Sequence, residues 1–167
     1  AERARYDQHE DTQPWDRLLS PLVALGGSLI PLAVGLDARL GWTAPFRSLV
    51  HMVALAAILA GYVFGALALI ENRFFSGTVR IQTERGHQVV SSGPYRWVRH
   101  PGYAGAVLTY LASPLLLDSL WALVPAVLLT AAIVIRTRLE DRTLQEQLPG
   151  YREYAGRVRY RLLPGVW

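Results

Sequence analysis

Four long apolar segments with almost no charge constrain the fold of this chain more than any other feature. They cover about 18–36, 49–70, 103–117 and 120–135 of the 167 residues. The first two approach the ~20 residues that a helix needs to span a bilayer. The last two are shorter and are separated only by Asp118 and Ser119, which indicates a tight helical hairpin. A charge at the centre of a bilayer costs several kcal/mol, so this separation of charged from apolar sequence favours a membrane.

The alternative interpretation is a pair of buried core helices in a soluble protein. Four such segments leave too little polar sequence to cover them, because a surface helix carries charged residues on its outer face. We therefore predict an all-α integral membrane protein in which residues 1–167 form a single domain. It would have about four transmembrane helices, including the hairpin, together with a cytoplasmic loop and a C-terminal amphipathic helix.

The arginines predict the orientation of the spans. Only Arg39 and Arg47 lie in the first connection, and the hairpin turn has none. The other arginines, Arg3 and Arg5 among them, lie before the first span, in the long connection 71–100 and in the tail from Arg136. Cytoplasmic loops carry an excess of basic residues. Both termini and the long connection are therefore predicted to face the cytoplasm from an inner (plasma) membrane. The net charge of +4 then reflects topology and contact with anionic headgroups. Nothing else points to nucleic acid.

Missing residue types exclude several chemistries. The chain has no cysteine and no lysine, so it cannot use a thiolate nucleophile, a cysteine-ligated metal or a Schiff-base lysine. His87 and His100 do not have the spacing of a histidine pair that binds a metal on one helix. We therefore expect no metal.

The stretch "GPYRWVRHPGYAG" carries the densest cationic cluster beside an apolar segment. Proline suits the first position of a helix, so the third membrane helix should begin near Pro101, with His100 near its N-cap. A helix N-terminus attracts anions, and Arg96, Arg99 and His100 would add to that attraction. The alternative is that these cations only fix topology and contact lipid phosphates.

The tail carries the complementary charges. Arg136 and Glu140 are four residues apart, and Arg138 and Asp141 are three apart, so each pair shares a helix face. They could form salt bridges on an extension of the fourth helix that ends at "LPGY", or one carboxylate could bind a cation or an ammonium group. The final "YREYAGRVRYRLLPGVW" predicts a short amphipathic helix on the membrane or folded back on the loop. Residues 71–100 predict a short irregular or hairpin-like loop.

These motifs resemble the isoprenylcysteine carboxyl methyltransferase family, part of a wider group of membrane methyltransferases that includes phospholipid methyltransferases. The resemblance covers roughly residues 71–164. It rests on Arg99-His100-Pro101-Gly102-Tyr103, preceded by Gly93-Pro94-Tyr95, and on Arg136 followed by Glu140-Asp141. The second acid of that group is shorter here than in the family pattern.

The resemblance implies S-adenosylmethionine as cofactor, bound by about 82–103 together with 136–164. It implies that Arg136 binds the methyl acceptor, that Glu140 takes part in catalysis, and that Glu140 accepts the cofactor ammonium. The remaining implied cofactor contacts are Gln82, His87, Gln88, Val89, Val90, Tyr95, His100, Pro101, Gly102 and Tyr103. The most similar reaction is protein-S-isoprenylcysteine carboxyl O-methylation. Phospholipid N-methylation, small-thiol S-methylation and a non-catalytic module that binds anionic lipid remain alternatives. The partners would be membrane lipids and a lipophilic or small methyl acceptor.

Overall fold

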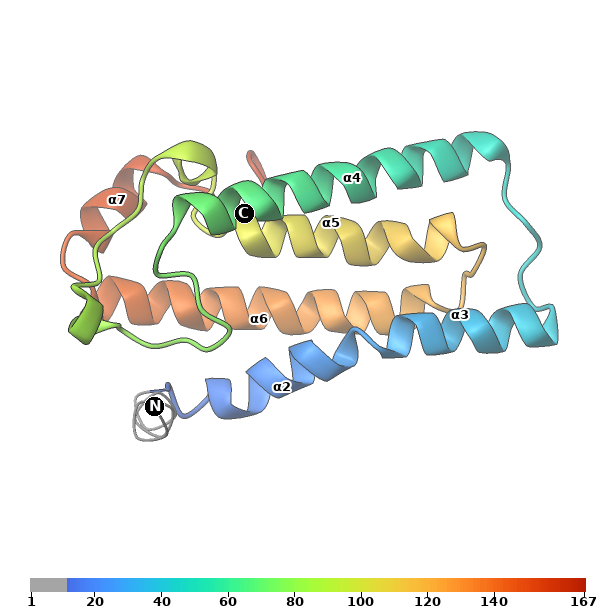
Figure 1. The fold of residues 1–167 in the computed structure, drawn as a ribbon, viewed down its shortest axis with the longest axis horizontal. Helices are drawn as coiled ribbons and strands as arrows, with labels where there is room; N and C mark the ends of the chain where they lie inside the picture. Colours follow the sequence, from blue (N-terminus) through green and yellow to red (C-terminus); the bar gives the residue numbers. More distant parts are fainter. Residues whose placement is uncertain (1–11) are drawn as a thin grey trace.

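The computed structural model describes residues 12–167, and these residues are helical with no strand. Figure 1 shows the long helices as roughly parallel columns. One column is made of α2 (Asp16–Gly26) and α3 (Leu29–Leu40), and the others are α4 (Ser48–Glu71), α5 (Pro101–Leu116) and α6 (Leu123–Gln147). The predicted cytoplasmic segment with Arg3 and Arg5 lies outside the described residues.

The first predicted span is a broken helix. α2 ends at Gly26, and α3 starts again after Gly27 and Ser28 and continues to Leu40, four residues beyond the predicted end. Gly41 then ends α3 in the left-handed conformation, with a φ of 65°. The prediction stopped at Leu36 because charged residues follow it. The helix continues because the buried Asp37 side chain has its own hydrogen-bond partners.

The second predicted segment is a helix, α4, over Ser48–Glu71. In the described part of the chain, Asp16–Leu40 and Ser48–Glu71 are long and apolar enough to cross a membrane. Only 6% and 17% of their apolar windows are buried, whereas the core helix of a soluble protein is mostly buried. Long apolar helices with this much exposed surface fit a membrane protein. α5 has 16 residues and the second half of α6 is polar, so the count of four spans stays a prediction.

α4 and α5 pack closely because each has a glycine at their contact. A Cβ on Gly105 would lie 2.4 Å from the carbonyl oxygen of Gly61, and a Cβ on Gly61 would lie 2.7 Å from that of Gly105. Small residues at such a contact let two helix backbones approach within a membrane. The α4–α5 pair thereby forms one wall of the bundle.

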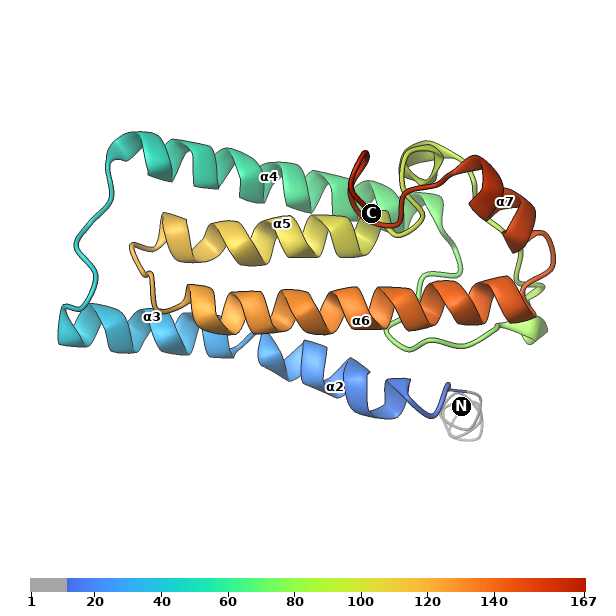
Figure 2. The ribbon, with the colours of Figure 1, turned by 180° about the vertical axis from the view of Figure 1, so that it is seen from behind.

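The two ends of the bundle differ in structure. One end, here called the turn end, holds the α3–α4 connection and the predicted tight turn between α5 and α6 (Figure 2). At this turn Asp118 has a φ of 52°, and its carboxylate accepts bonds from the Phe46 N–H (2.6 Å) and from His51. Asp37 accepts from the hydroxyls of Thr43 (2.7 Å) and Ser119 (2.6 Å).

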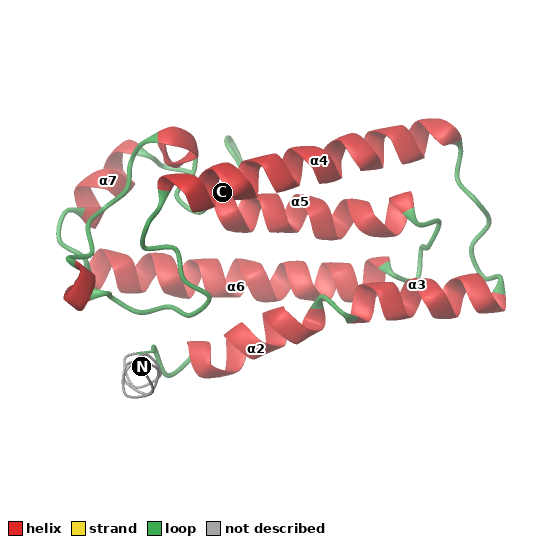
Figure 3. Cartoon of the chain, in the orientation of Figure 1, coloured by secondary structure: helices red, strands yellow, loops and turns green. Residues whose placement is uncertain are grey.

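The opposite end, here called the loop end, holds the start of α2, the long connection after α4, and α7 (Tyr151–Arg157) (Figures 1 and 3). The connection is irregular, with single turns of 3-10 helix at η1 (Thr83–Arg85) and η2 (Gly93–Arg96) and no hairpin strands. Of the two predicted alternatives, an irregular or a hairpin-like loop, the structure has the irregular loop. The long connection and the tail, which were both predicted to be cytoplasmic, lie at this end.

The predicted C-terminal helix is shorter than expected. α7 has seven residues, and the chain beyond Val158 is extended or bent. The reason is a backbone contact across the loop end: the N–H groups of Arg99 and His100 donate to the carbonyls of Tyr160 and Arg161, both at 2.9 Å. The tail folds back on the loop, which is one of the two arrangements predicted from the sequence.

Candidate functional site

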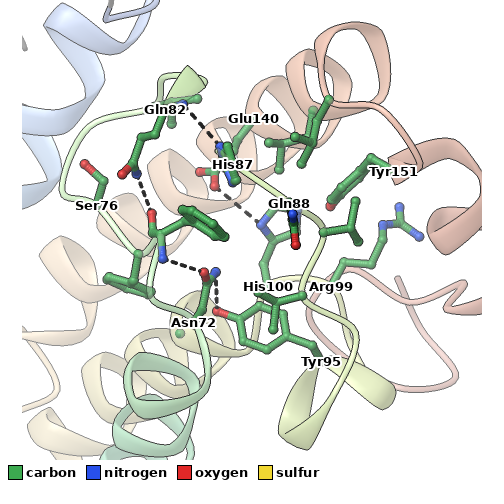
Figure 4. A pocket seen from close by; sticks show the side chains of 18 of the residues that line it. Asn72, Ser76, Gln82, His87, Gln88, Tyr95, Arg99, His100, Glu140 and Tyr151 are labelled. Carbon is green, nitrogen blue, oxygen red and sulfur yellow. Dashed lines mark hydrogen bonds and ion pairs between the residues drawn. The ribbon is translucent and has the colours of Figure 1, made fainter. Parts of the chain in front are cut away.

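A pocket lies at the loop end, between the long connection, the start of α5, the polar half of α6 and α7 (Figure 4). The space between its atoms measures about 780 Å³, including the part open to solvent. Most residues that the sequence assigned to a cofactor line this pocket, namely Gln82, His87, Gln88, Val89, Val90, Tyr95, His100, Gly102, Tyr103 and Glu140.

Three side chains from two helices meet inside the pocket. The Tyr103 hydroxyl donates to Oε2 of Glu140 at 2.7 Å. Nδ1 of His100 lies 3.9 Å from Oε1 of the same carboxylate, and the His100 and Tyr103 rings are stacked with centroids 5.9 Å apart. The predicted helix start at Pro101 brings His100 and Tyr103 to this place, and the continuation of α6 beyond the apolar segment brings Glu140 there. The arrangement offers one acceptor for a cation beside polar donors.

The neighbouring carboxylate, Asp141, is fully buried and serves the structure instead. Arg99 donates to both of its oxygens, at 2.6 and 2.9 Å, and Arg161 donates to Oδ2 at 2.9 Å. The Tyr151 hydroxyl and the Gln145 amide add further bonds. Burial alone would raise the pKa of Asp141, but the hydrogen bonds from His100 and Arg99 outweigh it and hold the pKa far below its ordinary value. The Arg99 guanidinium also donates to the Val158 and Arg159 carbonyls.

This pairing changes the interpretation of the cationic cluster. Of its three cations, Arg99 neutralises Asp141, and its guanidinium points away from His87 and Glu140 in Figure 4. Arg96 is exposed and bonds the Gly93 carbonyl. Arg99 and His100 both line the pocket, and His100 is the one that lies close to Glu140. The helix-sharing pairs expected in the tail are also replaced by long-range partners, with Asp141 bonded to Arg99 and Glu140 to Tyr103.

Gln82 and His87 organise the loop wall of the pocket around Phe74. The Gln82 amide nitrogen donates to the Phe74 carbonyl at 2.6 Å, and its oxygen accepts from Arg85 at 2.7 Å. Nδ1 of His87 accepts from the Gln82 N–H at 3.3 Å, and its ring lies 4.6 Å from that of Phe74. Burial, with the charges of Arg80 and Arg85, lowers the pKa of His87. His87 is thus neutral at pH 7, with its proton on Nε2.

Two predicted site residues, Pro101 and Arg136, are not among the residues that line the pocket. Pro101 begins α5 and fixes its first turn. Arg136 is buried and bonds the Asp16 carboxylate through Nε (2.7 Å) and Nη2 (3.1 Å), and it also bonds the Gly77 carbonyl (2.6 Å). Its guanidinium carbon lies 5.5 Å from the centre of the Tyr103 ring. Arg136 thus lies next to a pocket residue and already holds a carboxylate of this chain.

The sequence interpretation missed much of the remaining lining. Asn72 donates to the Tyr95 hydroxyl at 3.1 Å, and burial raises the pKa of Tyr95 to about 12, which keeps the phenol protonated. Gly102 lies so close to Phe75 that a Cβ would be 2.8 Å from its ring. The lining residues outside the predicted cofactor region are Asn72, Phe74, Phe75, Ser76, Thr78, Val79 and Arg80; those inside it that were not named as cofactor contacts are Arg99, Leu144, Leu148, Tyr151 and Tyr154. The apolar spacing of Leu144 and Leu148 on the polar half of α6 was the available signal.

The fold and the pocket together define a helical membrane protein with a partly polar binding site at one end of its bundle. Comparison with known proteins gives the family. A sequence model described as the isoprenylcysteine carboxyl methyltransferase (ICMT) family matches residues 50–146. The chain belongs to this family, as the motifs at Arg99 and Arg136 predicted.

Individual relatives have different functions. A delta(14)-sterol reductase of Mus musculus is 31% identical over 127 residues, which are 70% of this chain and 30% of that protein. A probable protein-S-isoprenylcysteine O-methyltransferase of Oryza sativa subsp. indica is 33% identical over 69 residues, 41% of this chain and 36% of that protein. Protein-S-isoprenylcysteine O-methyltransferase B of Arabidopsis thaliana is 29% identical over 107 residues, 62% and 54% of the two chains. The chain thus spans about a third to a half of the length of these relatives.

Proposed function

We propose that this chain is a membrane methyltransferase that uses S-adenosylmethionine and methylates the carboxylate of a lipophilic acceptor, as in isoprenylcysteine carboxyl O-methylation. The observation that carries the proposal is the Glu140 carboxylate, which faces His100 and Tyr103 across a pocket with aromatic and aliphatic walls. The two relatives named as isoprenylcysteine O-methyltransferases support it.

The pocket residues suit the cofactor chemically. S-adenosylmethionine supplies an electrophilic methyl group on a sulfonium, and its amino-acid end carries an ammonium and a carboxylate. Glu140 would accept the ammonium, while the N–H groups in the first turn of α5 beside His100 would hold the carboxylate. Val89, Val90 and Tyr95 would contact the flat base, and the neutral His87 has an Nε2–H to donate.

The state of the nearby acids favours a carboxylate acceptor over an amine or a thiol. A carboxylate is ionised at pH 7 and can attack the methyl group without losing a proton. A thiol or a protonated amine needs a general base whose pKa is near the working pH. Asp141 is unsuited to that role because its pKa is held far below the usual value, and Glu140 would be occupied by the ammonium. Phospholipid N-methylation and small-thiol S-methylation, which would need a pocket histidine as the base, are the second choices. Positioning and exclusion of water would carry most of the rate enhancement.

The membrane would deliver the acceptor. Large apolar side chains such as Leu18, Met52 and Ile70 are exposed on α2 and α4, as in lipid-facing helices. The arginine distribution supports a cytoplasmic loop end and an inner-membrane location. A lipophilic acceptor would then reach the pocket from the inner leaflet.

Calorimetry with S-adenosylhomocysteine tests cofactor binding by the detergent-solubilised chain. Glu140→Ala and His100→Ala should each weaken binding by about 1–3 kcal/mol, the cost of losing a buried polar partner. Glu146→Ala is the matched control, because Glu146 is an exposed carboxylate on the same helix, paired with Arg142. The absence of binding heat from the wild-type chain at millimolar ligand would refute the proposal.

A screen with radiolabelled cofactor would identify the methyl acceptor. It would compare methylation of prenylcysteine analogues, phosphatidylethanolamine and small thiols. The similarity to a sterol reductase makes reduction the competing chemistry. A chain that consumed NADPH with a sterol substrate and left the labelled methyl group in place would favour that reading. A chain that bound anionic vesicles but neither cofactor would be a lipid-binding module.

A further inference from the structure

The Arg136 guanidinium, which the family resemblance assigns to the acceptor, already binds a carboxylate of its own chain. Its Nε and Nη2 groups donate to the two oxygens of Asp16, at 2.7 and 3.1 Å. Both side chains are buried, with Asp16 fully covered. Two parallel N–H to oxygen bonds are the arrangement that an arginine forms with a carboxylate ligand. Asp16 thus occupies the position that an acceptor carboxylate would need.

Asp16 also connects the start of α2 to the wall of the pocket. Its Oδ2 accepts from the Val79 N–H at 2.7 Å, and the Gln13 N–H donates to the Val79 carbonyl at 3.0 Å. Val79 lines the pocket. Movement of Asp16 away from Arg136 would therefore also release the loop wall at Val79.

Tyr103 separates Arg136 from the pocket interior. The Arg136 guanidinium carbon lies 5.5 Å from the Tyr103 ring centre, and the Tyr103 hydroxyl reaches Glu140. A carboxylate that exchanged with Asp16 would thus bind Arg136 next to the residues assigned to the cofactor. Exchange of one carboxylate for another keeps the buried guanidinium paired, whereas leaving it alone would be strongly unfavourable.

We propose that Asp16 is a specificity-determining residue that competes with the acceptor: a carboxylate acceptor binds Arg136 only by displacing Asp16. This inference rests on the proposed carboxyl methylation. An acceptor with a large apolar group can offset the displacement by burying that group, whereas a small carboxylate cannot. The displacement adds the same cost to every carboxylate acceptor, so small acids fall below the affinity needed for turnover while a lipophilic acid still binds.

The test compares Asp16→Asn with the wild-type chain in detergent, using a prenylcysteine carboxylate as acceptor. The KM for this acceptor should fall about tenfold, as expected when the competent fraction rises from about 10% to nearly all molecules. The Kd for S-adenosylhomocysteine should stay unchanged. Glu146→Gln, which removes an exposed carboxylate on α6, should change neither value. An unchanged or higher KM with intact cofactor binding would overturn the inference and make Asp16 a support for Arg136.

A second measurement covers the case in which Asp16→Asn fails to fold. The Gln13 and Gln147 side chains lie 3.4 Å apart at the loop end, outside the pocket lining. The chain has no cysteine, so Gln13→Cys with Gln147→Cys allows a specific short bismaleimide cross-link. The cross-linked chain should lose turnover of the prenylcysteine acceptor and keep S-adenosylhomocysteine binding, while the single-cysteine variants treated with the same reagent keep both. Undiminished turnover after cross-linking would overturn the inference. If the untreated wild-type chain bound no S-adenosylhomocysteine, the proposed function itself would be wrong.

Discussion

The two ends of the bundle satisfy their buried carboxylates in different ways. At the loop end, Asp16 and Asp141 are bonded to arginine guanidinium groups. At the turn end, Asp37 is bonded to the hydroxyls of Thr43 and Ser119 and to the Thr43 N–H. Neutral donors are enough where the carboxylate only closes a connection. The arginine–carboxylate pairs occur at the end where the chain also surrounds a pocket suited to a charged ligand. Because Asp16 and Asp141 are both paired, Glu140 is the carboxylate that can bind that ligand.

The largest effect should come from removing the most highly bonded of these acids. Asp141→Ala leaves Arg99 buried without its counter-charge, which typically costs about 3–5 kcal/mol. Thermal unfolding in detergent should show a large fall in Tm, with the loop end and the tail separating first. Glu146→Ala removes an exposed acid from the same helix and should have little effect. Equal Tm values for the two variants would contradict the structural role of Asp141.

Asp37→Ala is the corresponding change at the turn end. It leaves the Ser119 and Thr43 hydroxyls without their acceptor, but it leaves no unpaired cation. The fall in Tm should therefore be clearly smaller than for Asp141→Ala. Binding of S-adenosylhomocysteine should not change, because none of these residues lines the pocket. A loss of cofactor binding would show that the two ends are coupled.

Tyr154→Phe tests the contact between α7 and the loop. The buried Tyr154 hydroxyl donates to the Tyr95 carbonyl at 2.7 Å. Losing one such bond should cost about 1 kcal/mol. Hydrogen exchange should become faster near Tyr95 and in α7, and should stay unchanged at the turn end. Uniformly faster exchange would mean that the loop end does not open separately.

The smallest effect should be a pH dependence confined to the loop end. The pKa of His87 is lowered on folding, so below its ordinary value of 6.5 the unfolded chain binds more protons than the folded chain. The neutral His87 ring makes its full contribution to folding stability above that pH. This contribution is lost as the pH falls towards the pKa of the folded chain. Wild-type stability should thus decline between pH 7 and 5, and His87→Gln should decline less. Parallel curves for the two proteins would contradict the prediction.

Local patterns in the sequence predicted the helices well. The start of α5 at Pro101, the turn at Asp118 and the continuation of α6 to "LPGY" all follow from proline rules, charge and periodicity. The start of α5 also placed His100 at a candidate anion site. Tyr103 and Glu140 were named as cofactor contacts through the family resemblance of the two motifs.

The partners of the charged residues could not be predicted in the same way. Helical spacing offered Glu140 to Arg136 and Arg138 to Asp141, but folding pairs Arg136 with Asp16 and Asp141 with Arg99. A buried pair must have all of its hydrogen-bonding groups satisfied together, and that depends on segments far apart in the chain. The short α7 has the same cause, because the backbone hydrogen bond from Arg99 to Tyr160 competes with continued helix.

The set of donors around Asp141 has a consequence for biosynthesis. They come from Arg99, His100, Gln145, Tyr151 and Arg161, whereas the side-chain partners of Asp37 are Thr43 and Ser119. Chains emerge from the ribosome N-terminal end first. The turn end can therefore assemble while the tail is still being translated, and the loop end cannot be completed until residue 161 has emerged. A ribosome that stalls between these two points would carry a nascent chain with its connections formed and its pocket still unfinished.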